Sequence, residues 1–296
     1  MDRGPVSRVT VVVLTHQRVR EVARTVERLL TLPESPRVIV VDNASSDGTP
    51  STIRERFPSV RLLALPVNLG AAGRNVGVRA ATTEHVALCD DDTWWVPGSL
   101  AQAVAVLEAH PRLAVVTGRV LVGPDGREDP TCAQMATSPL DGDPGCPGRP
   151  VLGFLAGAAV FRRSAFLEAG GFEPRFFLGG EEALLAIDLA ARGWWLAYAA
   201  SVVVQHHPSP RRGPAAQRRQ LMLRNALWCA WLRRPAPDAM LRSLALVREH
   251  RDVRVPGMLA ALAGAVWVLR HRRVAPPAVQ RALRRLDRLP ARPAVV

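Results

Sequence analysis

The chain has 296 residues, of which 48% are hydrophobic and 22% are charged, so its composition is that of a globular protein and excludes a disordered one. The formal net charge is +13, and the sequence contains no lysine, so arginine carries the positive charge. Such a charge suits nucleic acid, an anionic membrane surface or a phosphorylated substrate, and by itself it does not distinguish these partners.

The cysteines and the N-terminus indicate the compartment. The four cysteines form no CxxC pair and have no regular spacing, which argues against a zinc site and against a disulfide framework. The N-terminus lacks the charged start, apolar stretch and cleavage site of a signal peptide. We therefore expect a cytoplasmic protein, which would lie on the inner face of the cell membrane if its C-terminal part binds lipid.

Strands and helices are predicted to alternate over the first 122 residues. Short β-branched apolar runs predict strands, and apolar residues at helical spacing predict the helices between them. The predicted strands are residues 9–14, 37–41, 60–65, 85–89 and 113–122, and the predicted helices are residues 20–30, 52–57, 71–81 and 99–109. This alternation is typical of an α/β fold with a mostly parallel central sheet.

The second half of the chain is predicted to be less regular. Residues 123–150 are rich in proline, glycine and aspartate, and they predict a mobile surface loop. Two short helices, a late strand at 202–204 and a linker at 208–214 follow, and helices dominate after the linker. We expect two parts, an α/β domain of residues 1–210 and a helical, arginine-rich extension of residues 211–296.

Polar residues follow three of the predicted strands, which is where ligands bind in open α/β sheets. They are Thr15-His16-Gln17-Arg18, Asp42-Asn43 and Asp90-Asp91-Asp92. Carboxylates are the ligands that Mg²⁺ and Mn²⁺ prefer, and Asp90 and Asp92 could converge because alternate residues of an extended segment share a face. The alternative interpretation is a helix cap, because acidic residues commonly precede helices.

The order of these segments resembles glycosyltransferase family 2, whose members have the GT-A fold. The resemblance covers approximately residues 8–210. Residues 11–18 resemble the opening strand and loop of the family, residues 40–49 its second-strand motif, and residues 68–77 its Asn-x-Gly and Arg-Asn-x-Gly segment. Asp90-Asp91-Asp92 stands where the family has its metal-binding Asp-x-Asp.

The acceptor side of the family is recognisable further along the chain. Residues 157–172 resemble the acceptor-side segment, and Glu181-Glu182 stands where the family usually has Glu-Asp, the pair that supplies the catalytic base. Two positions depart from the pattern. Glu182 replaces the common aspartate, and Asp188 stands where many relatives carry arginine.

The resemblance implies an inverting, metal-dependent glycosyltransferase that moves a sugar from a nucleotide-sugar to a glycan or lipid-linked acceptor, in the assembly of cell-envelope glycan or glycolipid. Glu182 would be the base, Glu181 would orient or bind, and Mn²⁺ or Mg²⁺ would be held by Asp90, Asp92 and His206. The expected donor contacts are Thr15, Gln17, Arg18, Asp42, Asn43, Asn68, Gly70, Arg74, Asp90 and Asp91. For Arg74 and for the pair His206-His207, an ordinary surface or packing role is the alternative.

The extension has its own pattern. Arginines cluster at Arg211-Arg212, Arg218-Arg219, Arg233-Arg234 and around His271, and the apolar run 255–269 is shorter than the ~20 residues that a membrane span needs. This run could lie on an anionic membrane surface or pack as a helix on the catalytic domain.

Two other functions compete with the glycosyltransferase. One is a basic protein that binds nucleic acid or an anionic membrane on a non-catalytic α/β scaffold, although nucleic acid is the less favoured partner. Its binding would weaken steeply with salt, whereas donor binding would depend on a divalent metal. The other is a nucleotidyltransferase on a related sheet, but the glycine-rich, basic N-terminal loop expected of such an enzyme is missing.

Overall fold

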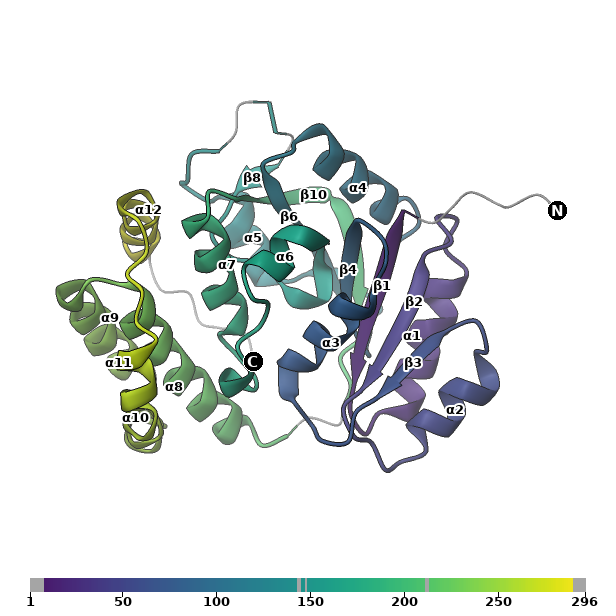
Figure 1. Ribbon diagram of the computed structural model, residues 1–296, viewed down its shortest axis with the longest axis horizontal. Helices are drawn as coiled ribbons and strands as arrows, with labels where there is room; N and C mark the ends of the chain where they lie inside the picture. The colour runs from purple at the N-terminus through teal and green to yellow at the C-terminus, as the bar shows by residue number, and fades with distance from the viewer. Residues whose placement is uncertain (1–7, 143–144, 147, 211–212, 290–296) are drawn as a thin grey trace.

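A twisted mixed sheet with helices packed around it forms the larger part of the molecule, and a group of helices stands at one end (Figure 1). The structure is a computed structural model, and it describes residues 8–142, 145–146, 148–210 and 213–289. In Figure 1 the first strands lie on the right and helices α8 to α12 lie together on the left.

The first four strands pair in parallel, in the spatial order β3-β2-β1-β4. They are β1 (Val9–Thr15), β2 (Arg37–Asp42), β3 (Arg61–Ala64) and β4 (His85–Asp90). The apolar residues of β1, β2 and β4 are almost all buried, as expected for strands covered on both faces, whereas those of the edge strand β3 are half-buried or exposed. The register sets Thr15 beside Asp42 and Leu14 beside Asp90, so the polar residues that follow these strands meet at one edge.

The other half of the sheet is mixed. The long strands β6 (Leu113–Val122) and β10 (Trp195–His206) pair in parallel, while β9 (Ala159–Arg162) runs antiparallel between β4 and β6. The short strand β5 (Thr93–Trp95) is antiparallel to β10. The long pairs are therefore parallel, as predicted, and the short strands reverse direction.

The predicted helices of the α/β domain are present with small shifts at their ends. They are α1 (Val19–Leu30), α2 (Thr49–Arg56), α3 (Gly73–Ala80), α4 (Ser99–Ala109), α6 (Arg163–Glu168) and α7 (Glu181–Ala191). Three short 3₁₀ helices are η1 (Gly70–Ala72), η2 (Ala156–Ala158) and η3 (Pro174–Phe176). Helix α1 buries Val22, Val26 and Leu29 and keeps its arginines in solvent, which is the amphipathic pattern that predicted it.

The stretch 123–150, predicted as a mobile surface loop, contains three short regular elements among its described residues. This stretch forms β7 (Arg127–Glu128), α5 (Pro130–Ala136) and β8 (Arg149–Pro150). The Asp129 side chain caps α5 by accepting a 2.8 Å hydrogen bond from the Thr131 N–H, and Cys132 and Met135 are buried. The elements are too short for their apolar spacing to stand out from the proline and glycine around them.

The C-terminal extension is helical, as predicted. Its helices are α8 (Ala215–Arg233), α9 (Ala236–Glu249), α10 (Arg254–Ala263), α11 (Ala265–Arg270) and α12 (Pro277–Asp287). Arg211 and Arg212, and with them the expected domain boundary after residue 210, lie outside the described residues. Within the described part of the chain, no helix is both long and apolar enough to cross a bilayer.

The extension is joined to the α/β domain by packing and, among the described residues, by the ion pairs Arg233–Asp188 and Arg285–Asp141. Leu184 and Ile187 of α7 share a buried cluster with Trp228 and other residues of the extension. Asp188 accepts hydrogen bonds of 2.5 and 2.9 Å from the Arg233 guanidinium of α8. Asp188, the departure from the family pattern, is therefore engaged in fastening the extension to α7.

Candidate active site

A cavity of about 640 Å³ opens at the edge of the sheet where the strands end. It is lined by the loop after β1, the donor-side loop 68–74, the three aspartates after β4, the start of α7, the end of β10 and the first turns of α8. All the residues predicted for the site line it except Gln17 and Asp42. Segments far apart in the sequence thus converge on one space.

Asp91 is one of the two buried members of the aspartate triplet, the other being Asp92. Its carboxylate accepts a 2.8 Å hydrogen bond from Arg18 Nη1 and a 3.0 Å bond from Thr15 Oγ1. Burial raises the pKa of Asp91 to about 7, against the opposing effect of the Arg18 guanidinium. Thr15 and Arg18 therefore hold the triplet in place as well as lining the cavity.

Asp92 lies against the end of β10. Its Oδ2 accepts a 3.0 Å hydrogen bond from the Ser209 N–H, and its Oδ1 is 3.5 Å from Nε2 of His206. Burial by itself raises the pKa of Asp92, but the contacts with His206 and Ser209 outweigh it and the net pKa is below its ordinary value. An ionised carboxylate and an imidazole therefore stand side by side at the cavity wall.

These two side chains fit a divalent cation, since oxygen and imidazole are both ligands of Mn²⁺. Asp90, the third predicted ligand, is ion-paired with Arg74 and its side chain is 38% exposed to the cavity. Among the described residues, no group of three His, Cys, Asp or Glu side chains is already arranged to hold a metal. The three-residue metal set thus stays a prediction, and the pair Asp92 and His206 is its best-supported part.

The acidic pair at the start of α7 faces Arg74. Oε1 of Glu182 accepts a 2.6 Å hydrogen bond from the Ala156 N–H. Burial, and then repulsion by Glu181, raise the pKa of Glu182 to about 8. Burial also raises the pKa of Glu181, whose Oε2 has no hydrogen-bond partner within the described structure. Arg74 opposes both shifts, so it is an electrostatic part of the site and not a surface arginine.

Three of the predicted donor contacts, Asn43, Asn68 and Gly70, line the cavity and also hold together the loop that begins at residue 68. Asn43 Nδ2 donates a 2.9 Å hydrogen bond to the Gly70 carbonyl, and Oδ1 of Asn68 accepts a 2.8 Å bond from the Gly70 N–H. Gly70 has φ +58°, and a Cβ there would lie 2.0 Å from the Phe177 carbonyl oxygen. That carbonyl accepts a 2.6 Å bond from Ala71 N–H, so this loop is tied to the segment before α7.

Gln17 and Asp42 lie outside the cavity wall. Gln17 has φ +56°, and both its backbone N–H and its side-chain amide bond the hydroxyls of Ser45 and Ser46. Oδ2 of Asp42 accepts a 3.1 Å bond from Ser45 N–H, while its buried Oδ1 has no partner among the described residues. Gln17 thus holds the loop at Ser45 and Ser46 in place. One carboxylate oxygen of Asp42 accepts no hydrogen bond from the described residues.

Sequence reasoning missed the apolar wall of the cavity. Phe177, Leu178, Leu221 and Met222 line it together with the acidic residues. Phe177 carries φ +60° and ψ −63°, a conformation that a bulky residue rarely adopts. The leucine and the methionine of α8 come from beyond the linker, and the pattern of α8 predicted a helix without indicating which face meets the site.

Comparisons with known proteins show the family of the chain. The profile of glycosyl transferase family 2 matches residues 10–170. The chain is 30% identical over 285 residues to the N-acetylglucosaminyl-diphospho-decaprenol L-rhamnosyltransferase of Mycobacterium tuberculosis, covering 82% of this chain and 92% of the relative. It is 31% identical over 209 residues to the pre-mycofactocin glycosyltransferase of the same organism, covering 69% of this chain and 43% of that protein.

Two solved structures share the fold. The mannosyltransferase PcManGT from Pyrobaculum calidifontis, in complex with GDP-Man and Mn²⁺, aligns with a TM-score of 0.61 at 23% identity, over 95% of this chain and 79% of the other. GalNAc-T7 with UDP, GalNAc and Mn²⁺ aligns with a TM-score of 0.62 at 14% identity, over 92% and 59%. The expected GT-A fold is confirmed.

Proposed function

Because the chain belongs to glycosyl transferase family 2, we propose that this glycosyltransferase is an inverting enzyme that moves a sugar from a nucleoside-diphosphate sugar to an acceptor hydroxyl. The observation that carries the proposal is the cavity itself. A weakly acidic Glu182 lies in the same cavity wall as the pair Asp92 and His206. This arrangement supports the proposal, because a direct displacement needs a base and a cation site at one cavity.

Glu182 has the properties of a general base. A base works best when its pKa lies near the working pH, and burial beside Glu181 raises the pKa of Glu182 to about 8. The Ala156 N–H holds one oxygen of this carboxyl, which leaves the other free to take the proton of an acceptor hydroxyl. Glu181 then acts on the base through repulsion.

The residues on the other side of the cavity suit the departing diphosphate. Asp92 and His206 would hold Mn²⁺ or Mg²⁺ with Asp90, and a bound cation supplies neutralisation of the charge that grows on the leaving phosphate. Arg74 and Arg18 line the same cavity and add fixed positive charge there. The Mn²⁺ in the two structural neighbours supports this cofactor.

We expect a UDP-, dTDP- or GDP-sugar donor. The GDP-Man and the UDP bound in the two structural neighbours support two of these three classes.

The acceptor is proposed to be lipid-linked and the enzyme to work at the inner face of the cell membrane, in cell-envelope glycan assembly. The decaprenol in the name of the mycobacterial relative supports this, and so does one helical face of the extension. Residues 255–269 carry no charged side chain, and Arg254 and Arg270 flank them. A run of this kind is typical of a helix that lies in a membrane interface.

The two faces of this helical run differ. Gly257 and Gly264 pack on α8, where a Cβ would lie 2.7 Å from Leu223 Cδ2 and 2.3 Å from Trp228 Cζ2. The other face carries apolar side chains at helical spacing, each between 39% and 66% exposed: Val255, Met258, Leu259, Leu262, Val266 and Leu269. The run therefore packs on the protein and also presents an unpartnered apolar stripe, which a bilayer would cover.

A panel of nucleotide-sugars tests the proposal. UDP-, dTDP- and GDP-sugars should bind and hydrolyse slowly only with Mn²⁺ or Mg²⁺, while ADP- and CDP-sugars serve as controls. Proton NMR of the released sugar reads the anomeric configuration and hence inversion. Retained configuration would contradict the single-displacement mechanism, and equal binding in EDTA would contradict the metal.

A further inference from the structure

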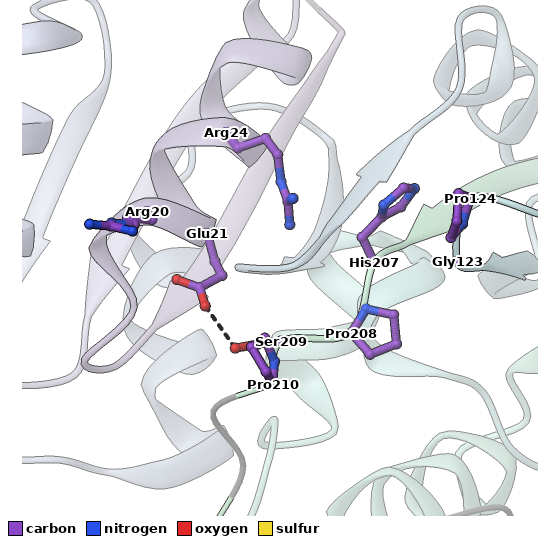
Figure 2. Close-up of a pocket in the computed structure, with 9 residues that line it drawn as sticks. All are labelled: Arg20, Glu21, Arg24, Gly123, Pro124, His207, Pro208, Ser209 and Pro210. Atoms are coloured by element: carbon purple, nitrogen blue, oxygen red, sulfur yellow. Dashed lines mark hydrogen bonds between the residues drawn. The ribbon is translucent and has the colours of Figure 1, made fainter.

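A second cavity, of about 360 Å³, lies beside the active site and takes no part in the chemistry proposed above. It is bounded by Arg20, Glu21 and Arg24 of α1, by Gly123-Pro124 after β6, and by residues 207–210 after β10. Figure 2 shows Arg24 reaching from α1 into the space that His207 borders on the other side.

The two cavities are separated by one extended segment. Successive residues of a strand point to opposite faces, so His206 lines the larger cavity and His207 the smaller one. Ser209 lies in the shared wall, where its N–H bonds Asp92 and its hydroxyl donates a 2.7 Å hydrogen bond to Glu21 (Figure 2). The second cavity is therefore distinct from the donor cavity and shares a wall with it.

The second cavity is strongly basic. Arg20 and Arg24 line it, and Arg28 lies one helical turn further along the exposed face of α1, outside the lining. No carboxylate of the described residues forms an ion pair with any of the three. Like charges at this spacing repel each other on a helix. The one acid in the cavity wall, Glu21, is engaged with Ser209.

The Trp94 ring lies beside two of these arginines, Arg24 and Arg28. The guanidinium carbons of Arg24 and Arg28 lie 5.5 and 5.9 Å from the centroid of the Trp94 ring, and the His207 ring lies 4.7 Å from it. Stacking on an indole fixes the orientation of a guanidinium and leaves its N–H groups directed sideways. Such preorganised forks match the oxygens of a phosphate group.

We propose that this second cavity is a phosphate-binding site, in which Arg24 makes the principal contact and Arg20 and Arg28 add charge. The phosphate belongs to a ligand other than the donor, since none of the three arginines lines the donor cavity. The chemistry is the same whether the group is carried by a soluble phosphorylated molecule or by a phospholipid headgroup.

Calorimetric titration of the full chain with inorganic phosphate, in EDTA and at constant ionic strength, tests the site. We expect saturable binding that weakens about tenfold or more in Arg24→Gln, since a charge-assisted hydrogen bond is lost. Glu21→Gln should tighten binding because it removes the repelling carboxylate. Arg54→Gln, which removes an exposed arginine of α2, should leave the affinity unchanged.

Three results would overturn the proposal. They are non-saturable binding, unchanged affinity in Arg24→Gln, and loss of binding in Arg18→Gln with Arg24→Gln unaffected, which would move the phosphate to the donor cavity. Cosedimentation with phosphatidic acid vesicles identifies the source. If the vesicles compete with free phosphate in wild type but not in Arg24→Gln, the site takes a headgroup, and if they do not compete, it takes a soluble phosphate.

Discussion

Oδ1 of Asp92 and Nε2 of His206 lie 3.5 Å apart, although the two residues are separated by more than a hundred positions in the chain. The contact joins the end of the β4 segment to the end of β10. From it we predict that His206→Ala weakens Mn²⁺ binding at least tenfold, because one of few ligands is removed. Isothermal titration of Mn²⁺ measures this.

The adjacent residue is the matched control for that experiment. His207 lines the other cavity, so His207→Ala should keep the Mn²⁺ affinity of the wild type. If the two variants behave in the opposite way, the metal lies on the other side of β10 and the proposed donor site is wrong.

The second prediction concerns the base. Glu182→Gln should retain metal-dependent donor affinity and lose sugar transfer by orders of magnitude, because removal of a base spares ground-state binding. The base must be ionised to act, so the wild-type rate should rise with pH and level off above about 8. Steady-state kinetics across this range measure it. Full transfer in Glu182→Gln with collapse in Glu181→Gln would assign the base to Glu181.

The rate should rise with pH, but the contribution of Glu182 to the free energy of unfolding should fall with pH. The folded pKa of Glu182 is raised to about 8 from about 4.5, so the native state binds this proton more tightly than the unfolded chain. The contribution is present below pH 4.5 and is lost as the pH rises through the folded value. Glu182→Gln should therefore flatten the fall in the free energy of unfolding between these pH values, as measured by urea unfolding.

The third prediction separates backbone strain from close packing. Gly70 and Gly98 both have positive φ, but a Cβ at Gly98 would have open space while one at Gly70 would strike the Phe177 carbonyl. Gly98→Ala should cost about 1 kcal/mol, the usual penalty for a left-handed alanine. Gly70→Ala should cost about 3 kcal/mol or more, because the clash adds to that penalty. If both variants lose the same free energy of unfolding in urea, the loop at Gly70 moves to accommodate the added methyl group at no cost.

The fourth prediction concerns the apolar stripe of α10 and α11. Leu259→Glu should reduce cosedimentation with phosphatidylglycerol vesicles severalfold, since a charge replaces an apolar contact with the bilayer. Leu30→Glu is the matched control, because it changes an exposed leucine on α1. Donor hydrolysis should be the same in both variants. Equal binding of both to the vesicles would remove this helix from the membrane contact.

Much of the site was predictable, because family motifs indicate its residues and the order of the strands brings them to one edge of the sheet. The ends of β1, β2 and β4 meet at one edge in any parallel sheet, so Thr15, Asp42 and Asp90 could be placed before the structure was known. Contacts between distant loops could not be placed. The bond from Ala156 N–H to Glu182 and the pair Arg18 and Asp91 depend on how loops fold over the edge, which no periodicity records.

Some residues predicted to contact the donor also have a structural role that the motif did not indicate. Asn43, Asn68 and Gly70 line the cavity, and their hydrogen bonds also hold the loop together, because buried backbone groups in a tight loop need partners. The direction of β9 was equally hidden, because a run of apolar residues does not encode whether a strand is parallel.

The close packing of Gly257 and Gly264 on α8 has a consequence for the size of the acceptor. One face of α8 lines the cavity through Arg218 and Leu221, while Leu223 and Trp228 contact the helical run 255–269 at its two glycines, without an intervening side chain. If that run lies in the bilayer surface, the cavity stands about one helix diameter, ~10 Å, above it. The enzyme would then select acceptors whose reacting hydroxyl extends that far from the lipid. A larger residue at either glycine would increase the distance between the bilayer surface and the cavity, and with it the length of the preferred acceptor.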